Sequence, residues 1–97
     1  MDTQFGLRVR ELRETRGLLQ RQVAALLDID TPLYSKIERG ERIAKKEVAI
    51  HLALILKANE AELLTLWLAD QVMDVLKDEK LASEALKTVS KKIKKNK

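Results

Sequence analysis

Apolar residues recur at helical spacing along almost the whole chain, and no segment shows the strict alternation of a half-buried strand. A first helix is predicted to begin after Asp2 or Thr3 and to end at Gly17, and a second to span about residues 20–27. The side chains assigned to their inner faces are Phe5, Val9, Leu12, Val23, Ala24 and Leu27. The pattern therefore predicts an all-α fold.

Four more helices follow from the same pattern. The third is predicted to run from Pro32 to Gly40, with Thr31 or Asp30 as its cap, because proline suits the first helical turn and glycine the residue after the last. The other three are predicted over about residues 45–56, over 59–77, and from 80 into the lysine-rich end of the chain. The apolar residues assigned to the inner faces of the third and fourth helices are Tyr34, Ile37, Val48, Leu52, Ile55 and Leu56.

Composition narrows the class of protein. The chain has 97 residues, enough for one hydrophobic core, and contains no cysteine, which excludes a disulfide framework. No apolar run approaches the roughly 20 residues of a membrane span and no signal peptide is readable, so we expect a soluble cytoplasmic protein that does not bind membranes. Charge is basic over residues 1–58, acidic over 59–90 and basic again at the end, which is compatible with a polyanionic partner.

The second and third helices have the layout of a helix-turn-helix, because they are short and three residues join them. Close crossing of two helices requires a small side chain, which Ala24 supplies, and a short turn requires a residue that tolerates the left-handed backbone. Asp28 meets the second requirement better than most non-glycine residues. In the third helix Pro32, Lys36 and Arg39 share one face, while its apolar residues point the other way.

The segment LRETRGLLQRQVAALLDIDTPLYSKIERGERI, residues 12–43, resembles the XRE-type or lambda-repressor-like family of bacterial and phage DNA-binding domains. The matching residues, in unbroken register, are Arg13, Gly17, Leu18, Gln20, Val23, Ala24, Leu27, Ile29, Ser35, Ile37, Glu38 and Gly40. The resemblance covers roughly residues 5–70. It implies a five-helix helix-turn-helix domain over residues 1–70, followed by a C-terminal helical extension over 71–97 that serves dimerisation or core completion.

The resemblance also implies roles for single residues. Gln20 matches the family glutamine that bonds a phosphate and braces the third helix, and Arg13 with Glu38 matches an interior ion pair. The residues implied to bind DNA are Gln20, Thr31, Pro32, Leu33, Ser35, Lys36, Arg39 and Arg42. Among these we expect Lys36 to donate a hydrogen bond to the edge of a guanine base, and Arg39 and Arg42 to bind phosphates.

Three departures from the family pattern weaken phosphate binding or the pre-organisation of the helices. Asp28 replaces the usual glycine, Asp30 adds an acid close to the expected path of the phosphates, and Leu19 stands where Ser or Asn usually caps the second helix. At the N-terminal end of the third helix, which the resemblance places against the bases, Thr31 offers the one hydroxyl group for hydrogen bonding. Apolar contacts with thymine methyl groups and the shape of the DNA are therefore expected to supply part of the recognition.

Residues 63–76, LLTLWLADQVMDVL, are too apolar for a helix that covers one core, since ten of the fourteen are apolar and occupy more than one stripe. The dimer interface predicted from this excess consists of Leu66, Trp67, Val72, Met73 and Leu76. The last helix has a stripe of its own, which either folds back over the fifth helix or packs on another chain. A homodimer with its two recognition helices about 34 Å apart would fit a palindromic operator.

The sequence thus predicts a sequence-specific transcriptional regulator that binds double-stranded DNA. It is not expected to be an enzyme, because no nucleophile and base are paired by spacing, and neither a cofactor nor a metal is predicted. The competing interpretation is an antitoxin of a toxin–antitoxin pair that also binds its own promoter, since such proteins often resemble this family. A segment that becomes ordered on a toxin would favour it, whereas the last third is expected to be helical and to satisfy its own apolar surface.

Overall fold

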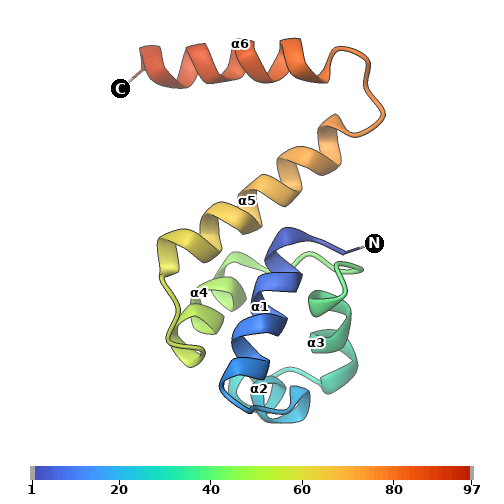
Figure 1. The fold of residues 1–97 in the computed structure, drawn as a ribbon, viewed down its shortest axis with the longest axis vertical. Coiled ribbons are helices and arrows are strands. Elements are labelled where there is room, and N and C mark those ends of the chain that lie inside the picture. The colour runs from blue at the N-terminus through green and yellow to red at the C-terminus, as the bar shows by residue number, and fades with distance from the viewer. Residues whose placement is uncertain (1, 97) are drawn as a thin grey trace.

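The computed structural model describes residues 2–96, and within this range the chain forms six α-helices and no strand (Figure 1). They are α1 (Gln4–Thr15), α2 (Gln20–Leu27), α3 (Thr31–Glu38), α4 (Lys46–Ile55), α5 (Glu60–Leu76) and α6 (Ala82–Lys95). The prediction of an all-α chain is confirmed, and the predicted helix limits lie within about two residues of these. Lys97, the last lysine of the basic end, lies outside the described residues.

Side-chain caps fix where three helices begin, because each satisfies a backbone amide that has no partner inside its helix. These bonds run from the Gly6 amide to Thr3 Oγ1 (3.0 Å), from the Leu33 amide to Asp30 Oδ1 (2.7 Å) and from the Glu62 amide to Asn59 Oδ1 (2.8 Å). The start of α2 differs, since Leu19 has no side-chain acceptor. There the Gln22 side chain accepts a bond from the Leu19 amide at 2.8 Å.

The core lies among α1 to α4 and the first half of α5. Its buried apolar residues are Phe5, Val9, Val23, Ala24, Leu27, Tyr34, Ile37, Ala44, Ala49, Leu52, Ala53, Leu56 and Leu63. All the residues that the pattern assigned to inner faces are either in this set or, like Leu12, Val48 and Ile55, packed against it. The pattern did not single out Ala49 and Ala53, which are buried in α4.

Two side chains of α5 fasten it to the rest of the domain. The Trp67 indole Nε1 donates a hydrogen bond to the carbonyl oxygen of Ala44 at 2.7 Å. The Asp70 carboxylate accepts bonds from the backbone amides of Gln4 and Phe5, at 3.0 and 2.8 Å. A residue near the middle of α5 therefore closes the N-terminus of α1.

α6 does not join this core. None of its residues is buried, and Figure 1 shows it crossing the far end of α5, away from the other helices. The radius of gyration of 15.1 Å exceeds the roughly 12–13 Å of a compact domain of this length. The expectation that the last third satisfies its own apolar surface is therefore wrong, because large apolar side chains of α5 and α6 remain exposed.

None of the helices within residues 2–96 combines the length and the apolar character that crossing a membrane requires.

Candidate nucleic-acid interface

The turn between α2 and α3 has the conformation that its sequence predicts. Asp28 has a φ of 58°, in the left-handed region, and the following amide, that of Ile29, returns to the carbonyl oxygen of Ala24 at 3.1 Å. Ala24 is buried in the core. The chain therefore reverses direction in three residues and sets α3 across α2.

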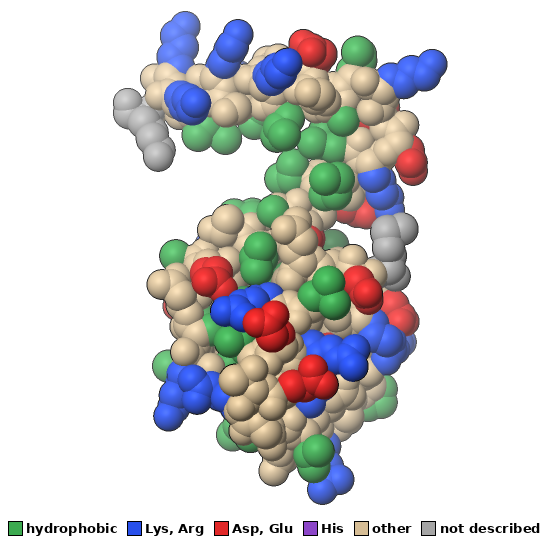
Figure 2. Space-filling view, viewed as in Figure 1, with side chains coloured by type: hydrophobic (Ala, Val, Ile, Leu, Met, Phe, Trp, Pro, Cys, Tyr) green, Lys and Arg blue, Asp and Glu red, His purple; other side chains and the backbone are tan. Residues whose placement is uncertain are grey.

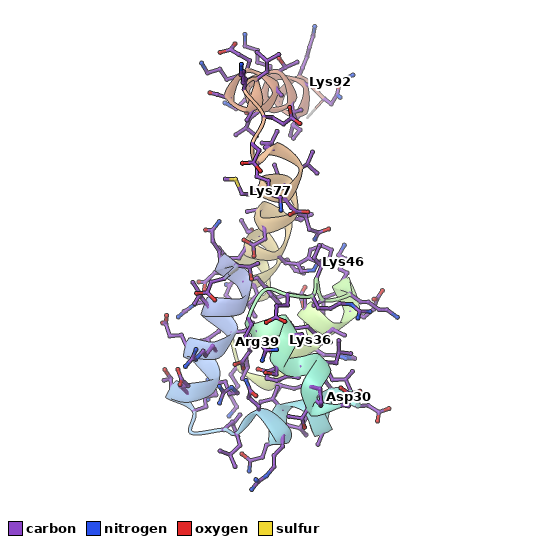
Figure 3. All side chains as sticks on the ribbon, turned by 90° about the vertical axis from the view of Figure 1, so that its right-hand side faces the viewer. Asp30, Lys36, Arg39, Lys46, Lys77 and Lys92 are labelled. Atoms are coloured by element: carbon purple, nitrogen blue, oxygen red, sulfur yellow. The ribbon has the colours of Figure 1, made fainter. Side chains whose placement is uncertain are left out.

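α3 begins with a cap that is itself an acid. Asp30 bonds the Leu33 amide, and Pro32 occupies the first turn, where no amide is required. Asp30 therefore serves the start of α3, yet its exposed position also places a negative charge at this end of the helix. Figure 3 shows Asp30 at one end of α3 and Lys36 and Arg39 further along the helix.

The structure divides the predicted DNA-binding residues into exposed and partly covered ones. Those exposed to solvent are Pro32, Lys36, Arg39 and Arg42, and those partly covered are Gln20, Thr31, Leu33 and Ser35. Leu33 packs against the core, so its side chain anchors α3 rather than facing outward. Gln20, Ser35 and Arg39 line one hollow of about 210 Å³. Arg42 lies in the loop after α3 and lines a different hollow, between that loop and α5.

Arg39 is not a free cation. Its Nε donates to Glu41 at 2.5 Å and its Nη1 donates to the Ser35 hydroxyl. The bond from Arg39, followed by the charges of Arg39 and Lys36, lowers the pKa of the Glu41 carboxyl below its ordinary 4.5. The sequence analysis did not mark Glu41. The spacing gave no signal, because residues two positions apart do not face each other on a helix; the turn at Gly40 brings the two side chains together.

A buried polar cluster supports α3 from the inside. Arg13 and Glu38 form a two-pronged ion pair, with Nε to Oε2 at 2.6 Å and Nη2 to Oε1 at 3.1 Å, and their side chains are 11% and 2% exposed. Gln20 Nε2 donates to the same carboxylate at 3.0 Å. The predicted brace from Gln20 to the third helix is thus present, while its phosphate contact stays a prediction.

The environment of Glu38 favours the charged form. Burial by itself raises the pKa of this carboxyl, but the hydrogen bond from Arg13, the neighbouring Tyr34 hydroxyl, the bond from Gln20 and the charge of Arg13 together outweigh burial, so the pKa lies below 4.5. Burial also raises the pKa of the Tyr34 hydroxyl. That hydroxyl lies beside Glu38 and Arg13, whose carboxylate and guanidinium act on its pKa in opposite directions, but it forms no hydrogen bond of good geometry with a described residue.

Gly6 determines how closely α1 and α3 pack, and the sequence analysis missed it. A Cβ atom at this position would lie 2.4 Å from the carbonyl oxygen of Glu38 and 2.9 Å from that of Ile37. Both distances are too short for any side chain. The missing signal was a glycine inside an otherwise regular helical pattern, which often marks close approach of two backbones.

The residues predicted to form a dimer interface do not share one surface. Leu66 and Trp67 are partly buried and pack against the core. Val72 and Met73 are exposed, and Leu76 is half-buried near α6. The excess of apolar residues in α5 therefore divides into an inner part, which the domain uses, and an outer part near the end of the helix.

The comparisons with known proteins agree with this architecture. A family model described as a helix-turn-helix domain matches residues 4–66, which contain α1 to α4 and the beginning of α5. Neither the search of curated proteins nor the search of solved structures gave a match. The matched range includes the α2–turn–α3 unit, the Arg13 and Glu38 pair and most of the core. Since the model covers well over half of the chain, the protein belongs to the helix-turn-helix domain family, of the XRE or lambda-repressor-like type.

Proposed function

We propose that this chain is a sequence-specific transcriptional regulator that binds a palindromic DNA operator as a homodimer, without a cofactor. In this proposal α3 enters the major groove, Lys36 contacts a base, and Arg39 and Arg42 hold phosphates. The regulator acts by occupying its operator, so that polymerase is excluded or recruited.

The observation that supports this proposal best is the division of α3 into two sides. Tyr34, Ile37 and Glu38 are buried on the inner side, while Lys36 and Arg39 are exposed on the other. Neither cation is in a buried contact, and α5 and α6 lie elsewhere (Figure 3). A rigid helix that presents Lys36 and Arg39 on one exposed side fits the width of the major groove.

The acids of this surface shape the expected binding. Asp30 and Glu41 lie at the two ends of α3 and partly offset the charge of Lys36 and Arg39. Non-specific attraction to the phosphates is therefore weak, and discrimination rests more on the fit of α3 to the groove. Thr31 and Pro32 supply one hydroxyl and apolar surface for thymine methyl groups.

Selection of bound sequences from random DNA tests the proposal first. A palindromic consensus with half-sites about one helical turn apart is expected. Binding titrations of variants on the selected operator and on a scrambled duplex, at two salt concentrations, then test the roles. Lys36→Ala is expected to cost about 1–3 kcal/mol and to relax preference at one base pair, whereas Arg39→Ala weakens both duplexes and flattens the salt dependence.

Lys87→Ala is the matched control, because it removes a lysine from α6, away from α3. If the Lys36 and Arg39 variants behave alike, the assignment of their roles is wrong. If neither differs from the Lys87 variant, α3 is not the DNA-binding helix.

The exposed end of α5 and α6 favours one second candidate, an antitoxin that also binds its own promoter. Leu81, Leu86, Val89 and Ile93 are about half exposed or more, so this part of the chain offers apolar surface to a toxin. Co-expression with the product of the neighbouring gene, followed by purification of a stable complex, would favour that role over a self-contained regulator.

A further inference from the structure

We infer that α5 controls how strongly the α3–α4 loop (residues 39–45) binds DNA. It does so through one hydrogen bond, by which Trp67 holds the carbonyl oxygen of Ala44 and so positions Arg42 for a phosphate. The inference rests on the proposed function, in which Arg42 binds that phosphate. It adds a positioning residue on α5 that acts through Arg42 without touching the DNA.

The α3–α4 loop is fixed where it leaves α3. The Gly40 amide donates to the carbonyl oxygen of Ile37 at 3.1 Å. The Glu41 amide donates to the carbonyl oxygen of Lys36 at 2.9 Å, and Gly40 has a φ of 75°. This left-handed turn is a common end of a helix, and it sets the path of the chain as far as residue 41. The position of Arg42, the next residue, therefore depends on what holds the loop beyond it.

Beyond Arg42 the loop is held at one point. Trp67 Nε1 donates to the carbonyl oxygen of Ala44 at 2.7 Å, and Ala44 is 4% exposed. Within residues 2–96, this is the one hydrogen bond that residues 42–44 form. A buried carbonyl that loses its donor is destabilised, so the loop would have to move if the bond were absent. Ile43 is 58% exposed and contributes little packing that could replace it.

Other side chains of α5 do not take over this role. A hollow of about 240 Å³ lies between the loop and α5, and its lining includes Arg42, Ile43 and Asp70. Asp70, about one turn beyond Trp67, accepts bonds from the first amides of α1 and not from the loop. The hydrogen bond from Trp67 is thus the link between α5 and the loop that passes beside it (Figure 1).

Arg42 is a cation whose placement counts. It is exposed and forms no ion pair with a residue of the described range, whereas Arg39 pairs with Glu41. Figure 2 shows lysine and arginine side chains of the domain interspersed with acids on the face in view, not gathered in one basic patch. A bond between a guanidinium and a phosphate requires defined geometry. A shift of the loop is therefore expected to cost the whole contact of Arg42.

The first experiment separates the bond from the cation. Binding titrations on the selected operator, at two salt concentrations, compare the wild-type full chain with Trp67→Phe, Arg42→Ala and the double variant. Trp67→Phe keeps an aromatic ring and removes the N–H donor, and it is expected to weaken binding about threefold or more. Like Arg42→Ala, it is expected to lower the slope of log binding constant against log salt concentration by up to about one.

The double variant gives the decisive comparison. If Trp67 acts through Arg42, the contact can be lost only once, so the double variant binds no more weakly than Arg42→Ala alone. Losses that add up in the double variant overturn the inference, because Trp67 would then act on binding by another route.

Thr65→Val is the matched control. The Thr65 hydroxyl also donates to a backbone carbonyl oxygen at 2.7 Å, but its acceptor is Ala61, within α5. This variant is expected to bind the operator like the wild type, and far-UV circular dichroism establishes that each variant keeps its helices. An equal loss of affinity in Thr65→Val and Trp67→Phe would trace the effect to α5 in general and overturn the role of the Ala44 bond.

A measurement on the wild type keeps the inference testable if Trp67→Phe does not fold. Coupling between two binding events is reciprocal, so a bond that favours the DNA contact is itself favoured by that contact, by the same factor. The chain has one tryptophan, so its indole N–H gives one NMR signal. Exchange of this N–H with solvent is expected to slow about threefold or more in the operator complex. In the complex of Arg42→Ala this slowing is expected to be absent. Exchange that the operator leaves unchanged, or slows equally in both complexes, overturns the inference.

The outcomes separate this inference from the proposed function. If Arg42→Ala weakens binding but Trp67→Phe does not, the inference alone fails. If Arg42→Ala binds like the wild type while Lys36→Ala does not, Arg42 has no phosphate contact to position, so the inference fails and the DNA-binding role of α3 stands. If the wild type binds no duplex DNA, the proposed function fails and the inference fails with it.

Discussion

The carboxylate of Asp70 accepts the backbone amide of Phe5 at 2.8 Å, although 65 residues separate the two. Its second oxygen accepts the amide of Gln4. The first amides of a helix lack partners inside the helix and carry a partial positive charge, so an anion is especially effective there. A side chain of α5 thus completes α1, and the N-terminal helix depends on the C-terminal half of the chain.

Replacing Asp70 with Ala should therefore lower the free energy of unfolding by about 1–2 kcal/mol, because two amides at the start of α1 lose their acceptor. Urea denaturation at neutral pH measures the change. Asp74→Ala is the control, since it removes an exposed carboxylate that pairs with Lys77 at 2.9 Å and should cost less than about 0.5 kcal/mol. Equal losses in the two variants would show that the cap adds nothing.

Gly6→Ala should destabilise the domain by about 1–3 kcal/mol, because the new methyl group would meet the carbonyl oxygens of Glu38 and Ile37. α3 has to move to relieve that contact, so affinity for the operator should fall as well. Gly17→Ala is the comparison. A Cβ atom at Gly17 would meet no neighbouring atom within 4 Å, but φ is +66°, so the expected loss is about 1 kcal/mol with DNA affinity unchanged. Loss of stability in Gly6→Ala without loss of DNA binding would contradict this account of the α1–α3 contact.

Glu41→Gln should strengthen binding to every DNA sequence. In the structure Glu41 forms an ion pair with Arg39. Removing the charge of Glu41 leaves the Arg39 guanidinium available to a phosphate. The slope of log binding constant against log salt concentration should become steeper by up to about one, because one more phosphate contact releases about one more counterion. Asp74→Asn, which breaks the pair with Lys77 on α5, provides a control of equal charge. Identical salt slopes for wild type and Glu41→Gln would mean that Arg39 makes no phosphate contact.

The buried Glu38 should make stability fall in acid. Its pKa lies below 4.5 in the folded protein, so the stability it contributes is fully present above that value and is lost as the pH falls through the lower, folded value. Glu38→Gln should lower the free energy of unfolding by about 3 kcal/mol at neutral pH, because it leaves the guanidinium of Arg13 without a counter-charge. The stability of this variant should also fall less steeply than that of the wild type as the pH decreases (a flatter acid limb of the stability curve). Urea midpoints measured from pH 7 to below pH 4 provide the comparison. Glu47→Gln, on an exposed position of α4, should keep the acid limb of the wild type.

The parts of the fold that depend on neighbouring residues could be predicted from the sequence. Helix limits follow from caps, glycines and apolar spacing, and the left-handed turn follows from Asp28. The contact of Asp70 with α1 could not, because it joins positions far apart, with no local pattern to mark it. The hydrogen bond from Trp67 to Ala44 could not be predicted for the same reason. Two apolar stripes on α5 predict that a second surface exists, but not which stripe faces the core.

The same reasoning applies to α6. An amphipathic pattern establishes that one side of a helix avoids water, yet it does not say whether the same chain supplies the cover. In the structure the apolar side of α6 is exposed to solvent, although the sequence suggested that the last third of the chain would cover its own apolar surface.

Trp67 is the one tryptophan of the chain, and its indole N–H is bonded to Ala44, four residues beyond the glycine that ends α3. Fluorescence from this indole therefore originates at the junction between the loop after α3 and α5. Any displacement of the loop after α3 would change the polarity around the ring, so the native chain contains an optical signal for that movement and requires no attached dye.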